Sequence, residues 1–311
     1  MNCLYKIKNR FYNFYKNRRR RKKLYRYIDE DVINLLRMKY VLIYLKNNYF
    51  STDIINTPPI HNQQVIENKV IWICWMQGED NANDIVKACI KSVREHSAGY
   101  DVILITEENI DSYVLFPDYI IKKYKKGQIT RTHFSDLLRV FLLVNYGGVW
   151  LDATVFLTDN IPENILNSDL FMFKTSILGF DFLPASSWFI AAKKNNPILR
   201  KLLNVLFSFW EKEEEMQHYY LFHIALLLLV KYDKESAELW EKLLYKNNSE
   251  PHVLQFKLFD LFSDSLKDHI WKISFAHKLS HYFTYLDNYE ALLKKEGTFY
   301  KYILGTLKEN D

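Results

Sequence analysis

The sequence has few of the features that crosslink secreted proteins or anchor membrane proteins. Its three cysteines, Cys3, Cys74 and Cys89, are an odd number without the spacing of a metal site, so we expect free thiols in a reducing cytoplasm. The longest aliphatic run covers only residues 224–230, far short of the roughly 20 residues that a membrane-spanning helix needs. No apolar signal-peptide core follows Met1. We therefore expect a cytoplasmic protein without a transmembrane helix.

Acidic residues are absent from residues 1–27, which hold eleven Lys or Arg interleaved with Tyr and Phe. Residues 28–311 hold the other 31 bases against 37 acids, so the body is acidic although the chain carries a net charge of +5. A basic aromatic segment can lie on an anionic membrane surface. The same composition is typical of a nucleic-acid-binding arm or a solvated tail. Because residues 28–311 are net acidic and do not continue the basic surface that a nucleic acid would need, we favour the membrane surface and expect no nucleic-acid partner.

Length and an apolar content of 49% allow the chain to bury a sizeable core. Apolar residues at helical spacing predict a helix within 29–47, and Pro58-Pro59 marks a polar linker behind it. The pattern divides the chain into a basic aromatic tail at 1–28, an N-terminal helix and linker at 29–68, a main domain at 69–290, and a C-terminal helical tail at 291–311.

The main domain opens with a strand, a helix and a strand. Residues 70–75 and 102–106 are short apolar runs typical of buried strands, and residues 83–96 have helical periodicity. Such a unit joins parallel strands by a right-handed crossover. A second helix, at 130–145, ends at a double glycine and leads into a third strand at 149–157. The fold class that we predict is therefore α/β with a Rossmann-type sheet.

Further elements are predicted towards the C-terminus. The patterns indicate strands at 170–174 and 187–192, helices at 197–209, 212–230 and 235–245, and a short strand before a terminal helix within 270–289. We thus expect the sheet to carry a helical N-terminal extension and helical C-terminal additions.

The stretch most informative about function is residues 135–154, SDLLRVFLLVNYGGVWLDAT. Asp136 and Arg139 are three residues apart and so share one helix face. Asp152 lies in a strand that is otherwise apolar, where an isolated carboxylate is costly, and open α/β sheets bind ligands at such strand ends. On spacing alone, a sugar or phosphate site and a structural Asp–Arg ion pair are both consistent with this pattern.

The stretch resembles the Ser-Asp-x-x-Arg … Tyr-Gly-Gly-x-Tyr-x-Asp-x-Asp signature of nucleotide-sugar glycosyltransferases with the GT-A fold. These include a group of mannosyltransferases and the glucosyltransferase domains of large bacterial cytotoxins. Together with the later Ser-Ser-Trp-Phe-Ile-Ala-Ala, it is most similar to the bacterial capsular polysaccharide synthesis protein family, over about residues 69–290. The resemblance implies a GT-A-like nucleotide-sugar-binding sheet and retaining hexosyl transfer from a nucleotide-diphosphate donor, with a UDP-sugar expected, in surface polysaccharide synthesis. The expected acceptor is a saccharide. If it is a lipid-linked glycan, the basic aromatic N-terminus would hold the enzyme at the inner face of the membrane, where such acceptors lie.

Roles on the donor side follow from this resemblance residue by residue. Asp136 and Arg139 match the pair that holds the donor sugar, and Asp152 matches the first Asp of the Asp-x-Asp motif, which faces the ribose and the metal; these three are the expected catalytic residues. Trp75 matches the aromatic residue that stacks on the nucleobase, although a Trp after a buried strand is also typical of a core.

A divalent cation, Mn²⁺ or Mg²⁺, is also implied, but Thr154 stands where the second Asp of the motif is expected. A hydroxyl is a weaker ligand for a hard cation than a carboxylate. Either another residue completes the shell of Asp152, for which His277 is the candidate, or the metal is less essential. Lys278 is expected to neutralise the departing diphosphate.

On the acceptor side we place Ser187 and Trp188, with Ser186 before them, and His223. A packing role for these residues remains open, because nothing in their spacing requires a ligand. Thr154 also leaves open a catalytically weak nucleotide-sugar-binding protein or a membrane-surface assembly protein.

Overall fold

The computed structural model describes residues 30–58, 69–97, 99–175 and 183–308, and the predicted basic tail at 1–28 lies outside them. Within this part the strands are β1 (Val70–Cys74), β2 (Asp101–Ile105), β3 (Gly148–Asp152), β4 (Val155–Leu157), β5 (Leu170–Lys174), β6 (Ala185–Ala192) and β7 (Ala276–Lys278). The helices are α3 (Glu30–Asn48), α4 (Thr52–Ile55), α5 (Asp84–Glu95), α6 (Ile110–Tyr113), α7 (Asp118–Lys125), α8 (Arg131–Tyr146), α9 (Glu163–Leu166), α10 (Pro197–Lys212), α11 (Leu221–Tyr232), α12 (Lys234–Glu241), α13 (Val253–Lys257), α14 (Asp264–Ile273), α15 (Tyr289–Lys294) and α16 (Phe299–Gly305), with a 3₁₀ turn, η1 (Glu250–His252).

The central sheet is mixed, which confirms the predicted α/β class. Among the described residues its strands lie in the order β2-β1-β3-β6-β5. Strands β1, β2 and β3 are parallel, whereas β6 runs antiparallel to both β3 and β5. The chain passes from β1 to its neighbour β2 on one side and then crosses to β3 on the other side of β1. The direction of the connections therefore reverses between β1 and β3. This is a topological switch point, where open α/β sheets bind ligands.

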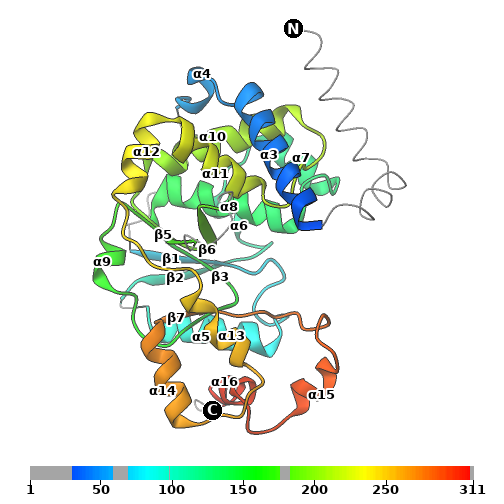
Figure 1. The fold of residues 1–311 in the computed structure, drawn as a ribbon, viewed down its shortest axis with the longest axis vertical. Helices are drawn as coiled ribbons and strands as arrows, with labels where there is room; N and C mark the ends of the chain where they lie inside the picture. The colour runs from blue at the N-terminus through cyan, green and yellow to red at the C-terminus, as the bar shows by residue number, and fades with distance from the viewer. Residues whose placement is uncertain (1–29, 59–68, 98, 176–182, 309–311) are drawn as a thin grey trace.

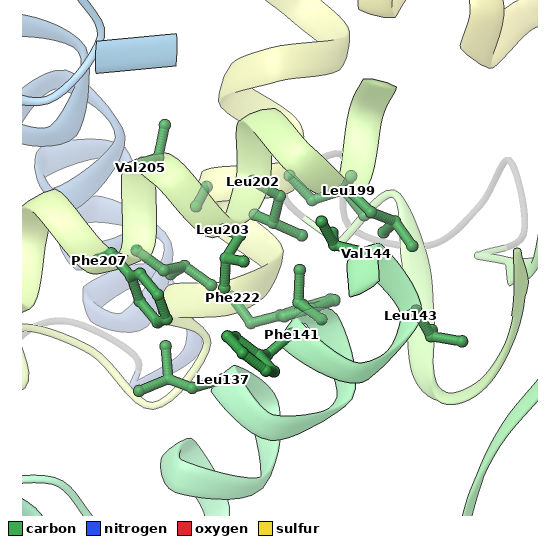
Figure 2. Packing of buried hydrophobic residues seen from close by; sticks show 14 of the residues in the cluster. Leu137, Phe141, Leu143, Val144, Leu199, Leu202, Leu203, Val205, Phe207 and Phe222 are labelled. Atoms are coloured by element: carbon green, nitrogen blue, oxygen red, sulfur yellow. The ribbon is translucent and has the colours of Figure 1, made fainter. Parts of the chain in front are cut away.

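Helices cover both faces of this sheet (Figure 1). On one face, Trp72 and Trp150 pack against helices α8, α10 and α11, with α3 outside them. Figure 2 shows the contact between α8 and α10, where Phe141 and Leu137 meet Leu203 and Phe207. On the other face, the alternate residues of β1 and β3 pack against α5, α14 and α16. The alternation of buried residues along each strand therefore divides the core into two layers.

Helix α8 is defined by local signals at both ends. The Thr130 hydroxyl accepts a hydrogen bond from the His133 amide and caps its start. Gly147 ends the helix with φ of +74°, and Gly148 follows with φ of +94°, in the left-handed region that favours glycine. A Cβ atom at Gly148 would collide with the carbonyl oxygen of Val70 on β1. The double glycine thus lets β3 start directly against β1.

The structure corrects the sequence predictions at several points. The strand predicted over 149–157 is two strands, β3 and β4, because β4 leaves the central sheet and pairs antiparallel with β7. The helix predicted over 212–230 begins only at Leu221. The patterns also missed α7, whose buried Lys123 donates to the carbonyl oxygens of Trp210 and Glu213 at the end of α10.

Segments that the sequence set apart are packed into the same body. Helix α3, from the predicted N-terminal segment 29–68, packs on α11. Phe299 and Ile303 of α16, from the predicted tail 291–311, are fully buried in the layer that contains α5. No helix in the described part of the chain combines the length and apolarity that a bilayer crossing requires.

Candidate active site

Charged side chains gather where β1 and β3 end side by side. Asp152, the last residue of β3, lies in register with Cys74, the last residue of β1. Strand β6 runs the other way, so its first residues, including Ser187, reach the same edge. The site therefore lies at the switch point of the sheet.

Arg139 of α8 is the centre of this cluster. Its Nη1 lies 3.2 Å from Oδ1 of Asp136, and its Nη2 lies 3.3 Å from Oδ1 of Asp152. Nη1 also donates to the Ser187 carbonyl at 2.8 Å, and Nη2 to the Ser135 hydroxyl at 3.1 Å. The guanidinium is almost fully buried, with 5% of the side chain exposed. Its planar fork of donors thereby holds three elements, α8, β3 and β6, in one arrangement.

Asp152 is paired on both of its oxygens. Oδ1 accepts from Nε1 of Trp150 at 3.1 Å in addition to facing Arg139, and Oδ2 lies 3.2 Å from Nζ of Lys278. Burial raises the pKa of Asp152, but the charges of Lys278 and Arg139, together with the hydrogen bonds from Trp150 and Lys278, outweigh burial, so the pKa lies below its ordinary value. Asp152 is therefore an anion at neutral pH, with a quarter of its side chain (26%) exposed to a ligand.

Lys278 reaches Asp152 because β7 pairs with β4. Val155 lies in register with Lys278, and the Leu279 amide donates to the Thr154 carbonyl at 2.9 Å. The ammonium of Lys278 also donates to the Thr154 hydroxyl. The two residues of the Asp-x-Thr motif, Asp152 and Thr154, thus share one lysine from the C-terminal part of the chain.

His277 is not brought to Asp152. Successive residues of a strand point to opposite faces, and the fully buried His277 ring lies against Thr158 and, at 5.3 Å between ring centroids, against Trp271. Burial lowers its pKa to about 4. Within the described ranges no group of three His, Cys, Asp or Glu side chains is placed to hold a metal ion. The residues present do not fit a divalent cation held between Asp152 and His277.

Trp75 follows directly after β1 at the edge of the site. Its ring is partly exposed and meets the ring of His281 edge to face, with 5.3 Å between centroids. Its Nε1 atom is buried without a hydrogen-bond partner. An indole that keeps part of its surface open at a strand end is suited to stack on a flat ligand.

The predicted acceptor-side residues are placed differently from one another. Ser187 contributes its carbonyl to Arg139. Trp188 is buried, stacks on Phe173 at 4.9 Å and donates to Asn248, so its side chain packs in the core. Ser186 has a buried hydroxyl without a partner.

His223, on α11, lies within reach of the charges of Asp136 and Arg139. Its Nδ1 is buried without a partner. Burial lowers its pKa to about 4, an effect that Asp136 opposes and Arg139 reinforces. The side chain is therefore a neutral imidazole close to the Asp136–Arg139 pair, with a nitrogen still able to bind.

Sequence reasoning missed two neighbours of these groups. His133 lies 3.3 Å from Asp136 Oδ2, and its position three residues earlier on the same helix was a usable signal. Trp150 places its ring 5.1 Å from the Arg139 guanidinium, and its position two residues before Asp152 puts both on one face of β3.

The switch point of this mixed α/β sheet, with its cluster of alternating charges, is the place where open α/β proteins bind their ligands. Comparison with known protein families identifies the family of this chain, because residues 8–303 match the capsular polysaccharide synthesis proteins. The chain belongs to the capsular polysaccharide synthesis protein family.

Individual relatives are distant. The O-glycosyltransferase braB of Annulohypoxylon truncatum is 26% identical in an alignment of 183 residues that covers 52% of this chain and 44% of the relative; the chain thus matches less than half of that protein's length. Among solved structures, the PaToxG glycosyltransferase has a TM-score of 0.35 and 16% identity, covering 89% of this chain and 98% of its own. A glycosyltransferase involved in glycosylation of the major capsid of PBCV-1 has a TM-score of 0.36 and 12% identity, covering 73% and 98%.

Proposed function

We propose that this protein is a glycosyltransferase that moves a sugar from a nucleoside-diphosphate donor, with UDP-sugars as the first candidates, to a saccharide acceptor in surface or capsular polysaccharide synthesis. Membership of the capsular polysaccharide synthesis family supports the proposal, as does the sequence similarity to an O-glycosyltransferase. The observation that carries it is the row of alternating charges formed by Asp136, Arg139, Asp152 and Lys278 at the switch point.

Each group in the row has a task in such a transfer. Asp136 accepts hydrogen bonds from hydroxyl groups of the donor sugar, and Arg139 orients both carboxylates. Trp75 stacks on the nucleobase. Asp152 binds ribose hydroxyls at the strand end, and Lys278 offsets the charge of the diphosphate.

The proposed binding of the acceptor depends on residues with less specific chemistry than the charged groups of the donor site. His223 and Ser186 each keep a buried polar atom without a partner, and an acceptor hydroxyl would satisfy them. We propose a lipid-linked glycan as acceptor, with residues 1–27 holding the protein on the anionic cytoplasmic face of the inner membrane, because that segment combines eleven basic residues with aromatic rings. Retention of anomeric configuration is part of the same proposal.

The test uses the purified full chain. Nucleotide sugars with different bases and sugars are screened for nucleoside diphosphate release, with and without saccharide acceptors, and product configuration is determined by NMR. We expect turnover with one donor class, and a loss of at least about 100-fold in Asp152→Asn and Asp136→Asn, since each removes one preorganised charge.

Asp169→Asn is the matched control, because Asp169 forms an exposed ion pair with Lys193 away from the site. Circular dichroism and thermal unfolding check that the variants fold. Normal turnover in either site variant would contradict the assignment.

The second candidate is a nucleotide-sugar-binding or assembly protein without efficient turnover, favoured by Thr154 in place of a second carboxylate. Binding of a nucleotide sugar without release of nucleoside diphosphate, with every donor, acceptor and divalent cation tried, would support this candidate over the transferase.

A further inference from the structure

We propose that the Lys278 ammonium takes the place of the divalent cation at this site, so that transfer proceeds without a metal ion; this rests on the proposed glycosyl transfer. The position of Lys278 is the first argument. Its Nζ atom contacts the carboxylate of Asp152 and the hydroxyl of Thr154, the two side chains at the ligand positions of the motif. A cation is therefore already seated between them.

Charge balance is the second argument. Two carboxylates with one divalent cation sum to zero, and Asp152 with neutral Thr154 and Lys278 also sums to zero. Replacing a carboxylate by threonine removes one negative charge, and replacing the divalent ion by an ammonium removes one positive charge. A divalent ion added beside Asp152 would upset this neutral balance. It would also lie at contact distance from the Lys278 ammonium, where like charges repel.

The remaining ligands argue in the same direction. Oδ1 of Asp152 is engaged by Arg139 and Trp150, and Oδ2 by Lys278. His277, the candidate for a further ligand, faces Thr158 and Trp271 instead. A metal ion would have to displace Lys278, and only one of the expected ligands would then carry a negative charge.

Lys278 keeps the capacity to bind the donor. An ammonium has three N–H groups, and among the described residues Asp152 and Thr154 engage two of them. The third remains for a phosphate oxygen. About a fifth of the side chain (21%) is exposed, so a ligand can reach it.

The chemical step then balances without a metal. The bond between the anomeric carbon and the β-phosphate oxygen breaks, and its electron pair stays on that oxygen. The acceptor hydroxyl oxygen bonds to the anomeric carbon, and its proton passes to the solution. Lys278, already charged and in place, stabilises the negative charge that develops on the departing diphosphate.

The experiment measures UDP binding by calorimetry, and transfer from the donor that the screen described above selects, in EDTA and in Mn²⁺. Wild type should bind UDP in EDTA and keep its transfer rate within about twofold of that in Mn²⁺, and Lys278→Met should lose both by at least about 100-fold, as expected for one preorganised donor. Lys278→Arg, which keeps the charge, should bind UDP better than Lys278→Met. Lys193→Met is the control, because Lys193 also pairs with an aspartate but lies outside the site.

Wild-type transfer that falls at least about tenfold in EDTA and returns with Mn²⁺ would overturn the inference while leaving the glycosyltransferase proposal standing; this arm needs no variant. Unchanged UDP binding by folded Lys278→Met in EDTA would also overturn it. Absence of both turnover and UDP binding by wild type in either buffer would instead contradict the proposed function, and the inference with it.

Discussion

The guanidinium of Arg139 lies within 3.3 Å of the Asp152 carboxylate, although one residue belongs to helix α8 and the other ends strand β3. The contact is possible because the chain reverses at Gly147 and Gly148 and brings the strand back beneath the helix. Arg139 also reaches Asp136 and the Ser187 carbonyl. One buried side chain therefore holds α8, β3 and β6 together at the site.

Replacing Arg139 tests this role. Arg139→Lys keeps the charge but not the fork of donors, so it cannot reach Asp136, Asp152 and the Ser187 carbonyl together. We expect transfer to fall by at least about 100-fold. Arg139→Met leaves the buried Asp136 without its cation and should lower the free energy of unfolding by about 3–5 kcal/mol, measured by urea denaturation. Arg94→Lys, which alters an exposed pair with Glu79, should change neither quantity appreciably; similar losses in this control would argue against a special role for Arg139.

Gly148→Ala should destabilise the protein strongly. The new Cβ would meet the Val70 carbonyl, and φ at this position is +94°, so we expect a loss of more than about 3 kcal/mol, since overpacking adds to backbone strain. Gly127→Ala separates the two effects, because Gly127 has φ of +71° with open space around it and should cost about 1 kcal/mol. Thermal and urea unfolding measure both variants. Equal losses would mean that the approach to β1 has no cost of its own.

Stability should fall as the pH drops from 7.5 to 5. Burial lowers the pKa values of His218, His223 and His277 to about 4, whereas unfolded histidines bind protons near pH 6.5. The unfolded chain therefore binds more protons between these values, and acid favours unfolding. Below the unfolded pKa, each of these histidines can lower the free energy of unfolding by up to about 1.4 kcal/mol for every unit that the pH falls.

Urea unfolding at both pH values measures this dependence. His277→Gln should reduce the difference by up to about 2 kcal/mol, because His277 is fully buried. His269→Gln, on an exposed position of α14, should leave the difference unchanged. A wild-type stability that is the same at both pH values would contradict the expectation.

Trp75 should control affinity for the nucleotide. Base stacking on an aromatic side chain is worth about 1–3 kcal/mol, so Trp75→Ala should raise the Kd for UDP by about 10- to 100-fold. Trp75→Phe keeps a stacking surface and should retain most of the affinity. Isothermal titration calorimetry distinguishes the two. If Trp75→Ala binds UDP as tightly as wild type, the indole belongs to the core and not to the donor site.

Several features of the site were predictable from nearby residues. The helix that carries Asp136 and Arg139, the glycine reversal and the strand that contains Asp152 follow from apolar spacing, capping and the left-handed preference of glycine, but the end of that strand at Asp152 does not. All these signals act within a few residues of the chain. The predicted helices at 83–96 and 130–145 accordingly match α5 and α8 to within about one residue at each end.

What the sequence by itself determined is this local framework: alternating strands and helices, and a carboxylate in an otherwise apolar strand. The tertiary structure alone decided which cation meets that carboxylate. Thr154 and Lys278 are 124 residues apart. No local sequence pattern near either residue predicts that β4 leaves the central sheet and pairs with β7. Strand β7 contacts η1 and α13 as well as β4, and the alternation of β7 turns Lys278 toward Asp152 and His277 away from it. Short-range steric preferences define the helices and strands, whereas long-range packing determines which charged side chains come into contact.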